Sequence, residues 1–370
     1  MMSHEDGQGG QDEMQQIISE SVAYLTPKLL QALEALAYTA RNLHPPALPV
    51  LVPVLSGLVS ELKQGRENLS RVDWPEDLAF FQRQLMVSTD QTLAAITGME
   101  NAVKDSNGVM LAYKALRKYT LAIEALYPLS EMLRPVSRYF LEPGYRDNEG
   151  LLDKLTNTSP DGESVGIMHA GNSRDERGGL SIYVPEYYEA EKKWPLVVAL
   201  HGGSGHGADS LWTWLREARA RGFVLLSPTS KNTTWSLMGD DQDSETLQRI
   251  VTGSCAQWNI DTERVLLTGM SDGATYTLLH GLAEDTPFTH LAPLCGTFHP
   301  MILEGMGSIE KKSVYLVHGE LDWMFPVETA RETQQCLSGK GASVVYREVP
   351  DLSHTYPREL NSDILDWFLA

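Results

Sequence analysis

A serine flanked by two glycines stands between a strand-like and a helix-like stretch of the chain. The pentapeptide from Gly269 to Gly273 reads Gly-Met-Ser-Asp-Gly, with the apolar run Val265–Leu267 before it and a helical pattern from Ala274 after it. Glycines let the backbone turn sharply and leave the hydroxyl of Ser271 exposed at the apex. The pattern predicts that Ser271 is a nucleophile, which needs a base and an orienting acid.

Candidates for the base and the acid follow later predicted strands. Asp322 comes after the apolar run Val314–Val317, and His354 comes after Val344–Val349. Reactive groups in a parallel sheet gather at the carboxyl ends of its strands. We therefore predict His354 as the base and Asp322 as its acid, in the chain order serine, aspartate, histidine.

Other roles and other residues stay open for the acid. Glu320 lies in the same loop as Asp322 and is the second candidate, whereas Asp351 fits the turn before His354. Asp322 is favoured by its place in a His-Gly-x-x-Asp sequence, and the alternative is that it caps a helix that starts near Pro326.

The acyl-transfer chemistry of such a serine also needs donors for an oxyanion. A glycine-rich loop, His-Gly-Gly-Ser-Gly-His-Gly from His201 to Gly207, follows an apolar strand. We assign the donors to the backbone amides of Gly203 and Asp272, each contributing roughly 3–4 kcal/mol in the transition state. Asp272 also begins a helix whose dipole favours negative charge. In this assignment the position of Asp272 matters more than its side chain.

Competing interpretations of the glycine-rich loop are weaker. No lysine follows in the P-loop pattern, and the next strand, Phe223–Ser227, ends without the acid that would bind a ribose. His201 and His206 lack the glutamate and the further ligand of a zinc site. We predict neither a metal nor a cofactor.

Composition limits the partners of the chain. Its 370 residues carry a formal net charge of −19, which argues against a nucleic-acid partner and against anionic membrane surfaces. The three cysteines are widely spaced, so we expect neither a disulfide framework nor structural zinc. The N-terminus lacks a basic and apolar leader, and the longest apolar stretch, around 47–59, contains two prolines. We expect a soluble, cytoplasmic protein with no stable membrane insertion.

The periodicity of the chain changes near residue 150. A leucine every three or four residues predicts a helix that buries one face, for which Thr26-Pro27 is the expected start. Beyond the turn-rich middle, eight short apolar runs, several separated by helical patterns, predict a mainly parallel sheet with an antiparallel hairpin at one edge. The predicted division is a disordered tail (1–12), an α-helical domain (13–141), a linker (142–163) and an α/β catalytic domain (164–370).

With these motifs in order, residues 165–370 resemble the α/β-hydrolase superfamily. The resemblance is to its serine carboxylesterases: phospholipase/carboxylesterases, dienelactone hydrolase-like enzymes, and feruloyl esterase or polyhydroxybutyrate depolymerase-like proteins. It implies hydrolysis of a small-molecule ester through an acyl-serine intermediate, with no cofactor. One departure is Asp272-Gly273-Ala274, where many relatives have glutamine or asparagine followed by two glycines. The helical domain matches nothing in the family core.

Several alternatives remain at this point. The same triad would serve a lysophospholipase, a thioesterase or an acyl-peptidase, and a non-catalytic interaction protein is a further alternative. The helical domain is expected to have a structural role or to join subunits into a homo-oligomer, and a lid over the active site is the alternative. Trp235 and Trp323 are candidates for a substrate pocket, with packing onto the sheet as the alternative for each.

Overall fold

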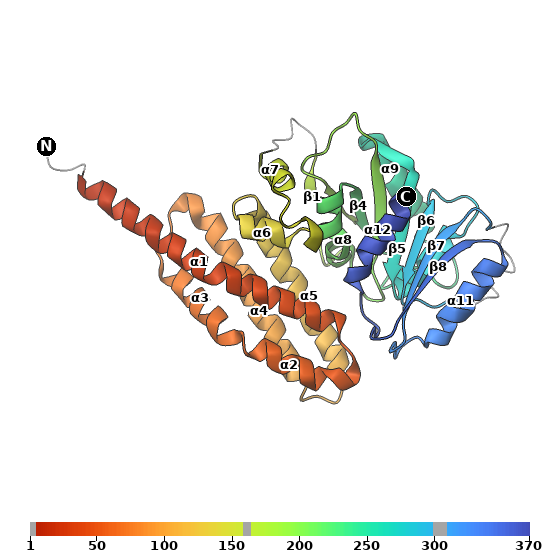
Figure 1. The fold of residues 1–370 in the computed structure, drawn as a ribbon, viewed down its shortest axis with the longest axis horizontal. Helices are drawn as coiled ribbons and strands as arrows, with labels where there is room; N and C mark the ends of the chain where they lie inside the picture. The colour runs from red at the N-terminus through yellow and green to blue at the C-terminus, as the bar shows by residue number, and fades with distance from the viewer. Residues whose placement is uncertain (1–4, 158–163, 299–308) are drawn as a thin grey trace. The chain divides into compact units, whose positions relative to one another are not determined.

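The computed structural model describes residues 5–157, 164–298 and 309–370. Its contacts divide the chain into two compact units, Met1–Phe140 and Leu141–Ala370. The described part of the first unit is helical, and the second unit contains an eight-stranded sheet (Figure 1).

The helical unit is built on one long helix and the helices that pack beside it. The predicted leucine stripe is confirmed, because Leu25, Leu29, Leu33 and Leu36 have no exposed surface. The elements are α1 (Glu5–Arg41), α2 (Leu48–Ser56), α3 (Val59–Arg71), α4 (Ala79–Ala102), α5 (Gly108–Leu126) and α6 (Arg134–Tyr139), with short 3-10 turns at Pro45–Ala47, Glu76–Leu78 and Tyr127–Ser130.

The start of the first helix differs from the prediction. Helix α1 runs through Thr26, and Pro27 lies inside it. A proline inside a helix costs about 3 kcal/mol, but each buried leucine contributes about 1.5–3 kcal/mol, so the stripe outweighs the proline. The helix also covers most of the segment 1–12 that was predicted as a tail, because extending a formed helix needs no new nucleus; residues 1–4 lie outside the described part.

No single described helix is both long and apolar enough to cross a bilayer. One pair, Pro45–Ser56 with Val59–Arg71, passes that test of length and composition together and is bent by 42° at its break.

The sheet of the second unit positions the candidate catalytic residues. Its strand order is β1-β2-β4-β3-β5-β6-β7-β8. The two pairings that involve β2 are antiparallel and the others are parallel, as expected for a parallel sheet with a hairpin at one edge. The strands are β1 (Gly166–Ala170), β2 (Leu180–Val184), β3 (Trp194–Leu200), β4 (Val224–Pro228), β5 (Ile260–Met270), β6 (His290–Leu294), β7 (Ser313–Gly319) and β8 (Ser343–Val349).

The direction of strand addition reverses beside β3. Strand β4 pairs with one edge of β3, and β5 pairs with the other. Such a reversal opens a crevice at the carboxyl ends of the neighbouring strands, where open α/β sheets bind their ligands. Ser271 directly follows β5 and therefore lies at this point of the sheet.

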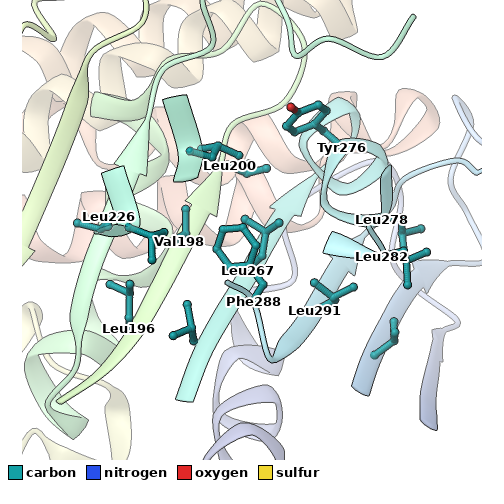
Figure 2. Packing of buried hydrophobic residues seen from close by; sticks show 14 of the residues in the cluster. Leu196, Val198, Leu200, Leu226, Leu267, Tyr276, Leu278, Leu282, Phe288 and Leu291 are labelled. Carbon is teal, nitrogen blue, oxygen red and sulfur yellow. The ribbon is translucent and has the colours of Figure 1, made fainter. Parts of the chain in front are cut away.

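Helices cover both faces of the buried central strands. They are α8 (Gly207–Arg221), α9 (Ser244–Gln257), α10 (Asp272–Gly281), α11 (Val327–Gly339) and α12 (Asn361–Leu369). Alternate side chains of one strand point to one face, so Leu196, Val198 and Leu200 lie in line and pack in one cluster with Tyr276 and Leu278 of α10 (Figure 2). This packing holds α10, and with it the turn at Ser271, against the sheet.

Part of the predicted linker 142–163 belongs to the second unit. A short turn, Pro143–Tyr145, and helix α7 (Glu149–Asn157) occupy it, and the leucines of α7 pack against Ala220 of α8. Arg221 donates to both carboxylate oxygens of Glu142 at 2.7 and 2.8 Å. Turn residues alone suggested a linker, but the spacing of Leu151, Leu152 and Leu155 gives this segment an apolar face to bury. Residues 158–163 lie outside the described part.

A buried histidine joins the ends of β3 and β4. His201 follows β3, and its Nδ1 lies 2.7 Å from the carbonyl oxygen of Gly202. Its Nε2 accepts a hydrogen bond from the amide of Ser230 at 3.0 Å. Burial lowers the pKa of His201 to about 3, so the ring is neutral at physiological pH. The neutral tautomer with the proton on Nδ1 satisfies both contacts.

We expect His201 to make the second unit sensitive to acid. Its pKa is about 3 in the folded chain and about 6.5 in the unfolded chain. Below pH 6.5 only the unfolded state takes up this proton, so stability falls as the pH decreases. Between pH 7.5 and 5 the loss is about 2 kcal/mol.

Urea unfolding of the wild type and His201→Gln at both pH values measures this effect. Tryptophan fluorescence reports mainly on the second unit, which contains all the tryptophans except Trp74. The variant should lose about 2 kcal/mol less than the wild type between the two pH values. Equal losses in the two proteins would show that His201 is not the cause.

Candidate active site

The turn at Ser271 has a strained backbone. Ser271 has φ 58° and ψ −124°, a conformation that residues other than glycine rarely adopt and that costs about 1–3 kcal/mol. Its amide donates to the carbonyl oxygen of Leu294 at 3.0 Å, and its own carbonyl accepts from the amides of Ala274 and Thr275. These bonds hold the turn between β5 and α10 and leave the serine side chain at its apex.

The two glycines of the motif are required by close backbone packing. A Cβ atom on Gly273 would lie 2.6 Å from the carbonyl oxygen of His201 and 2.7 Å from that of Leu200. A Cβ atom on Gly269 would lie 2.6 Å from the carbonyl carbon of Gly273. Real Cβ atoms do not approach other atoms so closely, so α10 reaches this position on the sheet only with glycines here.

The structure brings Ser271, His354 and Asp322 together from the ends of three strands. Nε2 of His354 lies 3.0 Å from Oγ of Ser271, and Nδ1 lies 2.8 Å from Oδ2 of Asp322. His354 and Asp322 are buried, and Ser271 is half-buried. With its proton on Nδ1, the imidazole donates to Asp322 and keeps the Nε2 lone pair for the serine hydroxyl.

Asp322 is the acid that contacts the histidine, and it also organises its own turn. Its Oδ1 accepts hydrogen bonds from the amides of Met324 and Phe325 at 2.9 and 2.8 Å. Burial acts to raise the pKa of Asp322, but the hydrogen bonds from His354 and Phe325 outweigh it and hold the pKa below its ordinary value. The carboxylate is therefore ionised at neutral pH. The alternative candidate Glu320 is exposed.

The imidazole is also held by packing. The ring of Phe325 meets that of His354 edge to face, with centroids 5.2 Å apart. The carbonyl of Phe325 accepts a hydrogen bond from Nε2 of His318 at 2.9 Å. His318 thus acts within its own turn, and the turn fixes the ring that packs on His354.

The loop after β3 passes beside the nucleophile. A Cβ atom on Gly202 would lie 3.4 Å from Cβ of Ser271, so this backbone runs alongside the serine. Among the described residues, the amides of Gly203 and Asp272 donate to no protein acceptor. The first amides of a helix have no partner within it, which accounts for Asp272. Both predicted oxyanion donors are therefore free to bind a ligand.

The two predicted pocket tryptophans have different environments. Trp235 is 3% exposed, its indole N–H donates to the carbonyl of His201 at 2.7 Å, and its ring stacks on Tyr276. Trp235 is thus a packing residue, the alternative considered for it. Trp323 is 42% exposed in the loop that carries Asp322. Leu321 and Met324 are exposed beside it in the sequence, and together they form an apolar group that was not predicted from the sequence.

The histidines of the glycine-rich loop are held by the backbone. His201 contacts Gly202 and Ser230, and His206 contacts the carbonyl of Glu176 and the amide of Ala208. Their ring nitrogens are therefore occupied by backbone groups. In the described ranges no group of three or more histidine, cysteine, aspartate or glutamate side chains is placed to bind a metal ion.

Comparison with known proteins gives a family match that lies within the second unit. The profile of the phospholipase/carboxylesterase family matches residues 230–368. An acetylxylan esterase of Coprinopsis cinerea is 30% identical over 132 residues, covering 32% of this chain and 34% of the relative. A bifunctional acetylxylan esterase/xylanase of Neocallimastix patriciarum is 27% identical over 154 residues, covering 40% of this chain and 22% of the relative. The chain thus spans about a third or less of these relatives' own length.

Solved structures align with a larger share of the chain. An acetyl xylan esterase from Aspergillus awamori aligns with 55% of this chain and 98% of its own, at 17% identity and a TM-score of 0.46. The strand order, the turn at Ser271 and the sequence matches agree with the resemblance seen in the motifs. The second unit has the α/β-hydrolase fold, and its residues 230–368 match the phospholipase/carboxylesterase family.

Proposed function

We propose that this protein hydrolyses carboxylic esters through an acyl-serine intermediate. Ser271 is the nucleophile, His354 is the general base and acid, and Asp322 orients the imidazole. The contact that carries the proposal is the 3.0 Å approach of Nε2 of His354 to Oγ of Ser271, with Asp322 bonded to the opposite ring nitrogen.

In the first step Ser271 attacks the ester carbonyl carbon. His354 takes the serine proton at Nε2, and the ionised Asp322 stabilises the resulting imidazolium. The carbonyl oxygen becomes an oxyanion, which accepts hydrogen bonds from the amides of Gly203 and Asp272. The intermediate then expels the alcohol, which leaves with the proton from His354, and an acyl-serine remains.

In the second step water replaces the alcohol. His354 takes a proton from the water as it attacks the acyl carbon, and the same amides bind the second oxyanion. Collapse of this intermediate releases the carboxylic acid and returns the proton to Ser271. The reaction as written balances with the ester and water alone.

Short acyl esters are the proposed substrate class. The two relatives described above are named as acetylxylan esterases, which act on an acetyl group by name. The exposed apolar group Leu321, Trp323 and Met324 supplies a surface beside the triad for the remainder of the substrate.

We predict that p-nitrophenyl esters from acetate to palmitate will be hydrolysed, with the highest kcat/KM at the short end. Ser271→Ala should lower kcat on the order of 10⁶-fold, because no other group can form the acyl intermediate. Spectrophotometric release of p-nitrophenol measures both. Equal rates in the two proteins would remove Ser271 from the mechanism, and an optimum at long chains would favour a lysophospholipase or thioesterase.

We predict that Asp322→Asn will lower kcat about 10⁴-fold, because an amide cannot hold the imidazole in the required tautomer. Glu320→Gln is the matched control: it removes the neighbouring carboxylate, which is exposed, and should change kcat less than about twofold. Steady-state kinetics on the preferred ester, with circular dichroism to check folding, test this assignment. A larger loss in Glu320→Gln than in Asp322→Asn would exchange their roles.

A further inference from the structure

The carboxylate of Asp272 lies between the two loops that carry the proposed oxyanion donors. Its Oδ2 accepts a hydrogen bond from Oγ1 of Thr234 at 2.6 Å. The same oxygen would lie 2.7 Å from a Cβ atom on Gly203, so it sits against the Cα of that glycine. Asp272 thus supplies one donor by its amide and touches the residue of the other by its side chain.

The segment that carries Thr234 is bonded to the glycine-rich loop as well. The amide of Ser204 donates to the carbonyl of Thr233 at 2.9 Å. The next contact is the indole of Trp235, which donates to the carbonyl of His201 at 2.7 Å. Ser204 has φ 55°, a left-handed conformation that is strained for a residue other than glycine. The hydrogen bond from its amide to Thr233 therefore holds a strained loop in place.

These contacts form a closed ring. It runs from Gly203 to Ser204, across the hydrogen bond to Thr233, along the chain to Thr234, and through the carboxylate of Asp272 back to Gly203. We infer that the hydrogen bond between Thr234 and Asp272 is a positioning contact that sets the separation of the two oxyanion amides. This inference rests on the proposed function.

The negative charge of Asp272 does not itself stabilise an oxyanion, so its contribution must come from positioning. A carboxylate beside a developing oxyanion has the same sign, so it opposes the transition state by Coulomb repulsion. Its location at the first residue of α10 is favourable for the helix dipole, and its bond to a hydroxyl is charge-assisted and therefore short. The carboxylate therefore fixes the position of Thr234 more firmly than a neutral side chain would.

The first test removes the hydroxyl and keeps the shape of the side chain. Thr234→Val should lower kcat about tenfold or more with KM unchanged, which is less than the 10²–10³-fold cost of losing one oxyanion donor completely. Thr234→Ser should restore most of the rate, because it returns the hydroxyl. Thr252→Val, at an exposed threonine of α9, controls for the loss of a hydroxyl elsewhere.

The second test changes the acceptor. Asp272→Ala should lower kcat by no more than Thr234→Val does, because it breaks the same contact but also removes the charge that opposes the oxyanion. Asp272→Asn should fall between Asp272→Ala and the wild type, since a neutral acceptor bonds less strongly. The double variant Thr234→Val with Asp272→Ala should have a kcat no lower than that of the less active single variant, because both changes break the same contact. Multiplied losses in the double variant would show that the two residues act separately.

A readout without an ester separates this inference from the proposed function. A fluorophosphonate reacts when Oγ of Ser271 attacks phosphorus: an O–P bond forms, the P–F bond breaks, fluoride leaves, and His354 accepts the serine proton. The phosphoryl oxygen occupies the oxyanion site during attack, so Thr234→Val should be labelled about tenfold more slowly than the wild type.

The outcomes are distinct. Hydrolysis and labelling by the wild type, with equal rates in Thr234→Val, would overturn the positioning role and leave the esterase proposal intact. Labelling without hydrolysis of any ester would overturn the esterase proposal, while the labelling rates still decide the role of Thr234. An equal loss of thermal stability in all variants, with no change in kcat or labelling rate, would make the contact purely structural and overturn the inference.

Discussion

The backbone of Ser271 must turn in a left-handed conformation, and the second unit is arranged around that turn. A strained residue persists only where its surroundings hold it in place. Here β5 precedes it in the middle of the sheet, the carbonyl of Leu294 in β6 accepts its amide, and α10 packs on the cluster shown in Figure 2. The close approach of Gly273 to the carbonyls of β3 and of His201 completes the hold. A serine on a looser loop would lack a fixed direction toward its base.

The buried acid is the second constraint, because an ionised carboxylate is expensive to bury without partners. Asp322 meets this cost with three hydrogen bonds, two from backbone amides and one from His354. The hydrogen bonds from the two backbone amides form the turn that places the ring of Phe325 against His354. The interactions that keep the acid ionised are therefore the same ones that orient the base, so charge and geometry are set together.

Local patterns in the sequence were enough to predict the parts of the site that depend on the order of the strands along the chain. Each predicted strand forms, and the reactive side chains follow β5, β7 and β8 because the carboxyl ends of parallel strands share one edge. Contacts between distant loops left no such pattern. Nothing near Thr234 in the sequence indicates that its hydroxyl donates a hydrogen bond to Asp272. In the same way, nothing near Trp235 indicates that its indole donates a hydrogen bond to the backbone of His201. These contacts depend on the three-dimensional path of loops, which periodicity does not encode.

Two predicted element boundaries were wrong for a related reason. Pro27 and the turn residues after Glu142 are local signals for an end, but tertiary burial of leucines overrode both of them. Burial of an apolar face is decided by what lies opposite it, which the local sequence does not specify.

The acidity of the chain does not conflict with the formation of an oxyanion. A formal net charge of −19 is spread over many surface carboxylates, and interactions between exposed charges are screened beyond about 8–10 Å at physiological salt. In the proposed mechanism, the backbone amides of Gly203 and Asp272 lie about 3 Å from the oxyanion and so act well inside that distance. Local dipoles therefore decide the energy of the transition state, and they do so only while their directions are held. The proposed mechanism therefore tolerates distant negative charge but requires the loop after β3 to keep its position.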